Sequence, residues 1–162
     1  MIDSTDRQIL KILQENARTS NAEIARQVRM APSAVLERIR RLETKGVIQG
    51  YEVKVNPEAV GLTLLAFVAV ASTDLPGETA TAELLAAIPE VEEAHHIAGD
   101  DCYLLKVRVR DTKALSYLLR ERISALGTVR STRTTVVLDT LRESRVLPLD
   151  SEEKDAGDLG VA

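Results

Sequence analysis

The sequence predicts an α+β protein built from two parts: three short helices, then strands and helices in the order βαββαβ. Up to residue 44 the apolar residues recur three and four positions apart, which is the helical period. Beyond residue 61, short β-rich runs alternate with helical patterns. The charge divides in the same way, because residues 1–56 carry a net +3 and the remainder −7, of a total of −4. Opposite charges on the two parts indicate two separate tasks.

Composition places the chain among compact globular proteins. With 162 residues, 44% of them hydrophobic, it is long enough for one or two packed cores. Its single cysteine excludes an internal disulfide framework and suits a reducing compartment. The first residues lack the apolar run of a secretory signal, and the longest apolar run, residues 62–71, is far shorter than the roughly 20 residues of a membrane helix. We therefore expect a cytoplasmic protein without a membrane span.

The first helix is expected within residues 1–17. Asp3 is placed to cap it, and Asp6 lies in its first turn, where a carboxylate interacts favourably with the helix dipole. One side of this helix is apolar and comprises Ile9, Leu10, Leu13 and Ala17. The helix is expected to support the two helices that follow.

Residues 20–46 predict two helices joined by a tight turn. Ser20 followed by Glu23 has the spacing of a capping box, so the first of these helices begins near Asn21. The turn spans residues 29–31, and Pro32 occupies the first position of the next helix, where proline is tolerated. Gly46 ends that helix as a left-handed cap. The buried side of the helix is a narrow stripe of Val35, Ile39 and Leu42.

The side of this helix opposite the stripe is polar. It contains Ser33, Glu37, Arg40 and Arg41. Seven basic and three acidic residues lie between positions 18 and 45. A helix held by one thin stripe, with an arginine-rich outer side, can enter the major groove of DNA as the second helix of a helix-turn-helix does. The alternative is an ordinary surface helix with a solvated charged side, but a local basic excess in an acidic protein favours DNA binding.

The helix-turn-helix domain is expected to span residues 1–55. Residues 47–55 form a strand-like run, either a wing beside the helices or an arm leading to the next domain. Asn56 and Pro57 end this run, and residues 56–61 are interpreted as a linker. The last residues, 146–162, carry five acids against one lysine and are expected to form a disordered acidic tail.

Residues 62–145 are expected to form the second domain. Its elements are strands at 62–72, 91–98, 103–109 and 129–138, with helices at 78–88 and from Asp111 to Gly127. With right-handed crossovers this order gives a four-stranded antiparallel sheet with both helices on one face, the ferredoxin-like arrangement. Its other face would expose the apolar residues Leu64, Ala66, Val68 and Val70, or their alternates. We therefore expect a second subunit over that face.

Six segments carry a recognisable pattern: IDSTDRQIL at 2–10, ENARTS at 15–20, EIARQV at 23–28, LERIRRLETKGVIQGY at 36–51, GDDCYLLKVRV at 99–109 and TRTTVVL at 132–138. Together they resemble the Lrp/AsnC (leucine-responsive, feast/famine) family of transcriptional regulators. The resemblance covers about residues 2–145. It implies a (winged) helix-turn-helix domain that binds palindromic operators in double-stranded DNA, and a RAM-type domain that forms homodimers, which assemble further to tetramers or octamers. The DNA affinity or oligomeric state would respond to a small effector, an amino acid bound between subunits.

The polar side of the second helix and the resemblance together give the candidate DNA-contacting residues. These are Arg18, Ser20, Ser33, Ala34, Glu37, Arg38, Arg40 and Arg41. The helix-turn-helix turn of the family usually has a glycine and then a serine cap, where this chain has Arg29 and Ala31. Loss of the cap alone costs about 1 kcal/mol, and we still expect the turn to form.

The turn joining the middle strands is the candidate effector site. Gly99 leaves backbone N–H groups open to a carboxylate, and Asp100 or Asp101 can accept from an ammonium group, so one turn can hold both ends of an amino acid. The resemblance adds Tyr103, Thr132, Thr134 and Val136 to this site. The family usually has Gly-Asp-aromatic-Asp-aromatic here, where this chain has Asp101 and Cys102 in the third and fourth places. We therefore expect altered effector selectivity.

Other chemistry is weakly indicated. His95, His96 and Cys102 could suggest a metal or haem, but adjacent strand residues point to opposite faces, so the two histidines cannot easily share one ion. No catalytic set, phosphate loop or zinc spacing is visible, and we expect no enzyme activity, metal or cofactor. A sirohaem-decarboxylase-like enzyme, which is similar in architecture, is the alternative function. A basic helix would have no purpose in such an enzyme.

Overall fold

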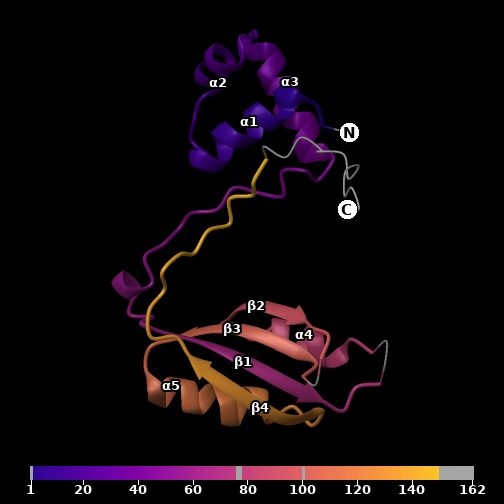
Figure 1. Cartoon of the computed structure of the whole chain (residues 1–162), viewed down its shortest axis with the longest axis vertical. Helices are drawn as coiled ribbons and strands as arrows, with labels where there is room; N and C mark the ends of the chain where they lie inside the picture. The colour runs from indigo at the N-terminus through magenta and orange to yellow at the C-terminus, as the bar shows by residue number, and fades with distance from the viewer. Residues whose placement is uncertain (1, 76–77, 100, 150–162) are drawn as a thin grey trace, which may run out of the picture. The chain divides into compact units, whose positions relative to one another are not determined.

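A computed structural model describes residues 2–75, 78–99 and 101–149 of the chain. These residues divide into two compact units, one formed by the chain up to residue 53 together with residues 143–149, the other by residues 54–142. The elements in chain order are α1 (Ser4–Glu15), α2 (Asn21–Val28), α3 (Pro32–Thr44), the 3₁₀ turn η1 (Glu58–Val60), β1 (Leu64–Ser72), α4 (Ala80–Ala86), β2 (Val91–His96), β3 (Tyr103–Val109), α5 (Thr112–Tyr117), the π-helical turn η2 (Leu118–Ile123) and β4 (Val129–Val136) (Figure 1). The predicted α+β class and element order are confirmed. No helix among the described residues is long and apolar enough to span a membrane.

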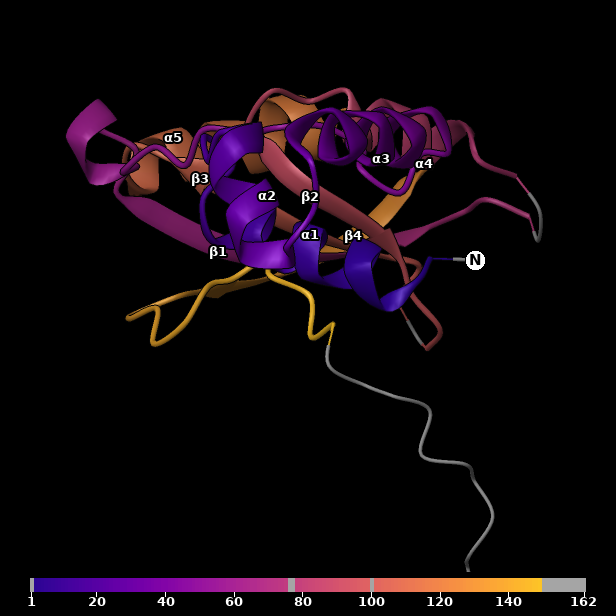
Figure 2. The ribbon, with the colours of Figure 1, turned by 90° about the horizontal axis from the view of Figure 1, so that it is seen from above.

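The first unit contains three short helices, drawn from two directions in Figures 1 and 2. These helices enclose a small apolar core. The core residues are Ile9, Ile24, Ala25, Val35 and Ile39. α1 begins at its predicted cap, because an Asp3 carboxylate oxygen accepts from the backbone N–H of Asp6 at 2.8 Å. The N–H of Asp3 donates in return to the Asp6 carboxylate at 3.3 Å, which completes a capping box. The helix is shorter than predicted, and Ala17 lies beyond its end and is exposed.

The turn between α2 and α3 forms as predicted, although the usual turn residues are missing. Arg29 adopts the left-handed conformation with φ 55°, and Ala31 provides no side-chain cap for α3. The Ser20 hydroxyl caps α2 by accepting from the N–H of Glu23 at 3.2 Å. The predicted capping box is only half formed, because the Glu23 carboxylate pairs with Arg26 instead.

α3 ends in a Schellman motif around Gly46. Gly46 has φ 68°, its N–H donates to the carbonyl of Glu43, and the N–H of Val47 donates to the carbonyl of Leu42, both at 2.9 Å. The left-handed cap predicted at this glycine is therefore confirmed. Only glycine adopts this conformation without a steric penalty.

The strand predicted at residues 47–55 is wrong. All of these residues are described, and none belongs to a sheet. Val53, one of the apolar residues of this segment, is 87% exposed. The alternation of apolar and polar residues here therefore does not reflect burial of one face. A β-like run needs a neighbouring strand to satisfy its backbone, and the first unit contains helices instead. Tyr51 remains near α3, where its hydroxyl donates to the Glu43 carboxylate at 2.9 Å.

The chain returns to the first unit after the sheet. The side-chain amide of Gln14 accepts from the N–H of Leu147 at 2.7 Å and donates to its carbonyl at 3.2 Å. Arg145 also pairs with Glu52, at 2.5 Å. Leu147, which belongs to the segment expected to be a disordered tail, is thus bonded to α1, whereas residues 150–162 lie outside the described residues.

The second unit is a four-stranded antiparallel sheet in the order β2-β3-β1-β4. The helix-covered side of this sheet carries Ala66, Val68 and Val70 of β1 and Tyr103, Leu105, Val107 and Val109 of β3, all buried in one core with Leu85, Leu118 and Ile123. The strand predicted at residues 103–109 is therefore confirmed, and its apolar residues Tyr103, Leu105, Val107 and Val109 share the covered side. The strands at 62–72, 91–98 and 129–138 and the helix at 78–88 form, each shortened by up to a few residues. Asp111 caps α5 as predicted, accepting from the N–H of Ala114 at 2.8 Å.

The open side of the sheet carries the alternate residues of β1. Leu65, Phe67, Ala69 and Ala71 point away from the helices, next to Leu104 of β3. Of the two sets that the sequence left open for this face, the structure therefore selects the alternates. Charged residues flank this apolar strip, because Arg108 pairs with Glu92 at 2.5 Å and Lys106 with Glu93 at 3.2 Å.

Candidate nucleic-acid interface and effector region

The outer side of α3 is the candidate DNA-reading surface. Ser33, Glu37 and Arg40 are all exposed there, and Ala34 beside them is half-buried. In the described part of the chain, the Arg40 guanidinium has no hydrogen-bond or ion-pair partner. This side of the helix is thus polar and open, as reading of base edges requires.

Two other candidate residues lie at the start of helix α2 or just before it. The Ser20 hydroxyl is engaged as the α2 cap, where it accepts from Glu23. Arg18 is exposed, and its backbone N–H donates to the Asn16 side chain at 3.0 Å. Its guanidinium has no partner among the described residues. Arg29, in the turn before α3, is exposed and equally without a side-chain partner there.

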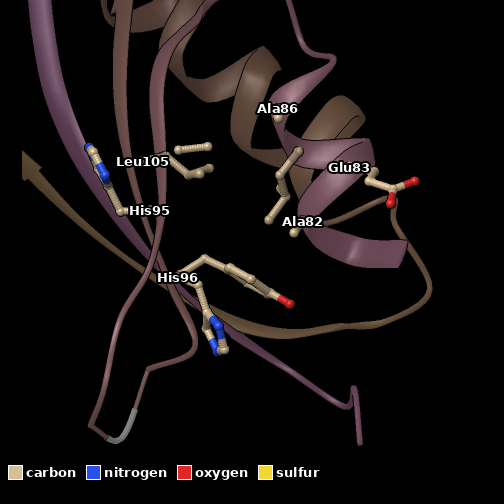
Figure 3. A pocket seen from close by; sticks show the side chains of 9 residues that line it. Ala82, Glu83, Ala86, His95, His96 and Leu105 are labelled. Atoms are coloured by element: carbon tan, nitrogen blue, oxygen red, sulfur yellow. The ribbon is translucent and has the colours of Figure 1, made fainter. Parts of the chain in front are cut away.

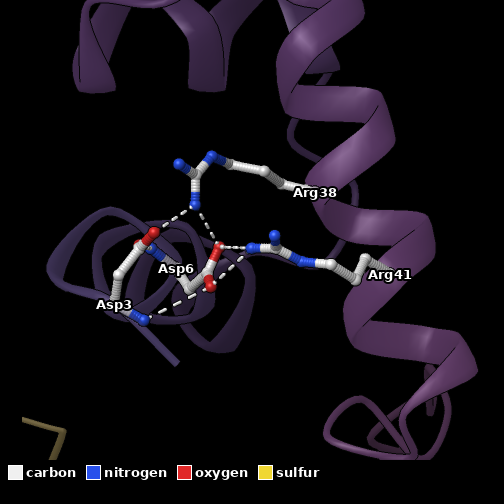
Figure 4. A network of polar contacts seen from close by, with 4 residues as sticks. All are labelled: Asp3, Asp6, Arg38 and Arg41. Atoms are coloured by element: carbon white, nitrogen blue, oxygen red, sulfur yellow. Dashed lines mark hydrogen bonds and ion pairs between the residues drawn. The ribbon is translucent and has the colours of Figure 1, made fainter. Parts of the chain in front are cut away.

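Arg38 and Arg41 are paired within the unit instead (Figure 4). The Arg38 Nη1 atom lies 2.6 Å from an Asp3 oxygen and 2.7 Å from an Asp6 oxygen. The Arg41 Nη2 atom lies 2.9 Å and 3.2 Å from the two Asp6 oxygens. We call these four residues the ion-pair clamp, which joins the first turn of α1 to the second half of α3.

The electrostatics of the clamp follow from these contacts. Hydrogen bonds from the Arg38 guanidinium and from the N–H of Asp6 lower the pKa of the Asp3 carboxyl. The two carboxylates, Asp3 first, raise the pKa of the Arg38 guanidinium. The Asp6 side chain is only 2% exposed, so the clamp has a buried anion at its centre.

A spacing signal could have revealed the clamp in the sequence. Asp3 and Asp6 are three residues apart, as are Arg38 and Arg41, and residues at that spacing share one side of a helix. Two acids and two bases with matched spacing can meet when their helices pack. Taken one helix at a time, however, the acids fit helix capping and the arginines fit a DNA-facing side, which hides their pairing.

The candidate effector residues fall on two sides of the sheet. Gly99 has φ 138°, and Asp100 lies outside the described residues. The Asp101 carboxylate accepts from the Arg133 guanidinium at 2.5 Å. Arg133 pairs in register with Ala69, so this contact belongs to the open side. Sequence reasoning did not identify Arg133, although its position between two threonines on a strand places it on the opposite face from them.

The remaining effector candidates lie on the helix-covered side. Thr132, Thr134 and Val136 are in register with Val70, Val68 and Ala66, which are core residues. The structure therefore does not bring these three together with Asp101 within one chain. All three remain at least partly accessible, because β4 is an edge strand.

Tyr103 is part of a buried polar network rather than of the open turn. It is 4% exposed, and its hydroxyl donates to Asp74 at 2.9 Å. The Thr81 hydroxyl donates to the same Asp74 carboxylate at 2.7 Å and lies 2.6 Å from the hydroxyl of Thr128. Burial, and then the Asp74 carboxylate, raise the pKa of Tyr103, while the bond from Thr81 lowers the pKa of Asp74.

A hollow of about 240 Å³ lies between α4 and strands β2 and β3 (Figure 3). Its walls are mainly apolar. The ring of His96 contacts that of Tyr103 with 5.4 Å between centroids, whereas His95 lies 3.3 Å from a Glu93 oxygen, and the two histidines point apart (Figure 3). Among the described residues, no three His, Cys, Asp or Glu side chains are placed to hold a metal ion.

Comparison with protein families decides the class of this protein. A winged helix-turn-helix DNA-binding model matches residues 2–49, and the Lrp/AsnC ligand binding domain matches residues 65–147. The chain belongs to the Lrp/AsnC family. It is therefore a DNA-binding transcriptional regulator with a ligand-binding domain.

Relatives of this Lrp/AsnC protein match it over almost the whole chain. The transcriptional regulator LrpA of Mycobacterium tuberculosis is 40% identical over 144 residues, which cover 89% of this chain and 95% of the relative. The leucine-responsive regulatory protein of Escherichia coli is 39% identical over 150 residues, 90% of each chain. These names favour the regulator over the sirohaem-decarboxylase-like alternative.

Solved structures agree with this assignment. A transcriptional regulator of Neisseria meningitidis, in complex with L-methionine, superposes with a TM-score of 0.86 at 30% identity, covering 93% of this chain and 98% of that one. The feast or famine regulatory protein of M. tuberculosis, also complexed with L-methionine, gives 0.84 at 39% identity, covering 91% and 99%.

Proposed function

We propose that this Lrp/AsnC regulator binds palindromic operators in the cytoplasm as a symmetric homodimer or a larger homo-oligomer, with α3 in the major groove. The observation that carries the proposal is the exposed outer side of α3, formed by Ser33, Glu37 and Arg40, within a helix-turn-helix of a DNA-binding family. Two-fold symmetry of the protein requires half-sites separated by multiples of about 10 bp. Arginine commonly makes a bidentate contact with guanine, so Arg40 is the residue proposed to read a base.

A gel-shift assay tests this proposal with the duplex upstream of the protein's own gene and a scrambled duplex of equal length. Arg40→Ala should weaken binding to the upstream duplex by roughly tenfold or more, because one base or phosphate contact is worth about 1–3 kcal/mol. Arg122→Ala is the matched control, since it removes the same charge from an exposed position in the other unit. Equal losses in the two variants would point to a general charge effect and against α3 as the reading helix.

The open side of the sheet is the proposed dimer interface. Leu65, Phe67, Ala69 and Ala71 form its centre. Phe67 is 37% exposed, whereas the other three are less than 9% exposed within the chain, so Phe67 is the main apolar group that a partner would cover. A two-fold axis would place the strip of one protomer on that of its partner. The charged residues at its border would then form the polar rim. Such dimers would assemble further to tetramers or octamers through other surfaces.

The proposed effector is a small amino acid, bound at the turn that contains Gly99 and Asp101. Relatives that cover almost the whole chain bind L-methionine, which supports this class of ligand. In this proposal backbone N–H groups of the turn receive the carboxylate, and the ammonium competes with Arg133 for Asp101. Thr132, Thr134 and Val136 would contribute from a neighbouring subunit, while buried Tyr103 supports the base of the turn.

The effector is tested in two stages. A thermal-shift screen of the twenty amino acids identifies a ligand, because one that binds only the native state raises the melting temperature. Calorimetry then compares wild type with Asp101→Ala and Thr134→Ala, which should bind at least several-fold more weakly. Thr135→Ala is the control, because Thr135 is the next residue on β4 and faces the opposite side. Unaltered binding in both test variants would place the ligand elsewhere.

A further inference from the structure

Two of the basic residues on α3 are already neutralised by the protein itself. Each guanidinium of the ion-pair clamp faces a carboxylate, so Arg38 and Arg41 together with Asp3 and Asp6 have no net charge. The guanidinium groups of Arg18, Arg29 and Arg40, by contrast, have no partner within the described residues. The unit therefore has two kinds of arginine: those whose guanidinium is open to a DNA phosphate, and those whose guanidinium is already paired with a carboxylate of the protein.

The burial of the Asp6 carboxylate holds the paired arginines in place, although the Arg41 side chain itself is 47% exposed. The Asp6 side chain is 2% exposed, and its oxygens accept from Arg38, from Arg41 and from the N–H of Asp3. If either arginine turned towards a phosphate, a buried carboxylate would lose a cationic partner, which is far less favourable than leaving an exposed acid unpaired. The arginines remain with Asp6 unless the packing of α1 on α3 changes.

The clamp also has the geometry of a positioning device. Arg38 and Arg41 leave α3 about one turn apart, and both reach the carboxylate of a single α1 residue, Asp6 (Figure 4). Two contacts at different positions along α3 restrict the rotation of α3 about its own axis as well as its distance from α1. The apolar stripe that holds α3 is narrow, so polar contacts on its flank add orientation that apolar packing alone does not supply.

We propose that the ion-pair clamp sets the orientation of α3 for DNA reading, and that Arg38 and Arg41 act as positioning residues while Arg18, Arg29 and Arg40 contact the phosphates or bases. This inference rests on the proposed function of α3. It revises the assignment of Arg38 and Arg41 as DNA contacts that the sequence suggested.

The salt dependence of DNA binding by the full-length protein separates the two roles. Each phosphate contact contributes about −0.9 to the slope of log K against log salt, so Arg40→Ala should reduce the slope by about 1.8 for a dimer when Arg40 contacts a phosphate. Arg38→Ala and Arg41→Ala should weaken binding to the upstream duplex by roughly tenfold, the loss typical of one misplaced base contact, with the slope unchanged. Their binding to a scrambled duplex should change little.

Asp6→Asn provides the sharpest readout, because the two roles predict opposite signs. This substitution makes the DNA-binding unit more positive, so a purely electrostatic contribution would strengthen binding. Loss of the clamp would weaken binding to the upstream duplex despite the added charge. Asp3→Asn is a milder version at a half-exposed carboxylate and is used if Asp6→Asn melts near the assay temperature.

Three results would overturn the inference. They are a slope reduced by about 1.8 in Arg38→Ala or Arg41→Ala, tighter binding by a folded Asp6→Asn or Asp3→Asn variant, and additive thermal shifts in a double-mutant cycle of Asp6 and Arg41. The last measurement needs no DNA. If wild type showed no salt-dependent binding to any duplex, the proposed function would fail, and the cycle would still report whether the clamp holds α3.

Discussion

Phe67 offers the most direct test of the proposed dimer interface. It lies at the centre of the open side of the sheet and is 37% exposed, the most exposed apolar residue of that strip. Truncation to alanine removes its ring without adding charge, so the variant keeps the strand and its pairing with β3. If two copies pair through this face, each loses the burial of one ring.

The size of the effect follows from the exposed fraction. A phenylalanine side chain has roughly 200 Å² of accessible surface, so 37% corresponds to about 75 Å² still available for burial. At about 25 cal/mol per Å² this is worth about 2 kcal/mol per ring, and about 4 kcal/mol for the two rings of a symmetric dimer. The dimer dissociation constant of Phe67→Ala should therefore rise by up to about a thousandfold.

Sedimentation velocity over a wide range of protein concentration measures this change. Leu84→Ala is the control, because Leu84 lies on α4, on the covered side of the sheet, and is 52% exposed. Circular dichroism establishes that both variants are folded. An unchanged association constant in Phe67→Ala, together with dissociation of Leu84→Ala, would refute the open-face dimer and place the contact on the helices.

Three further predictions concern stability and are checked by chemical or thermal unfolding. Ala31→Ser should stabilise the first unit by about 1 kcal/mol by supplying the missing α3 cap, whereas Ala31→Val should not. Leu118→Ala, at a fully buried core position, should cost about 2–5 kcal/mol, and a smaller loss would indicate collapse of the cavity. The hydrogen bond from Thr81 lowers the pKa of Asp74 in the folded protein. The ionised carboxylate therefore contributes its full stabilisation above the unfolded pKa of about 3.9, and this stabilisation is lost as the pH falls through the lowered folded pKa. Stability should therefore fall less steeply in acid for Asp74→Asn, and an identical pH profile would exclude this contribution.

Local sequence signals predicted most of the fold. Asp3, Ser20, Pro32 and Gly46 act on backbone groups within a few residues of themselves, so their positions alone fix where helices begin or end. The alternation in residues 103–109 predicted β3 because a sheet covered on one face imposes a period of two. These signals require no knowledge of distant contacts.

Sequence signals are least informative where a distant partner decides the outcome. Residues 47–55 alternate like a strand, but no strand in the first unit is available to pair with them. Arg38 and Arg41 have the composition of a DNA-reading surface, and only the packing of α1 against α3 brings Asp6 to them. In the same way Thr134 and Asp101 were grouped by the family resemblance, while sheet register places the threonine on the covered side.

The hydrogen bonds between Gln14 and Leu147 also have a consequence for synthesis of the chain. These residues are separated by 133 positions, so the helices of the first unit leave the ribosome well before the segment that packs on α1. At about 5–20 residues per second this interval is roughly 7–27 s, during which the whole sheet unit emerges. A nascent chain therefore exposes its helix-turn-helix in an incomplete form. Completion of the DNA-binding unit, which includes residues 143–149, follows translation of the rest of the described chain.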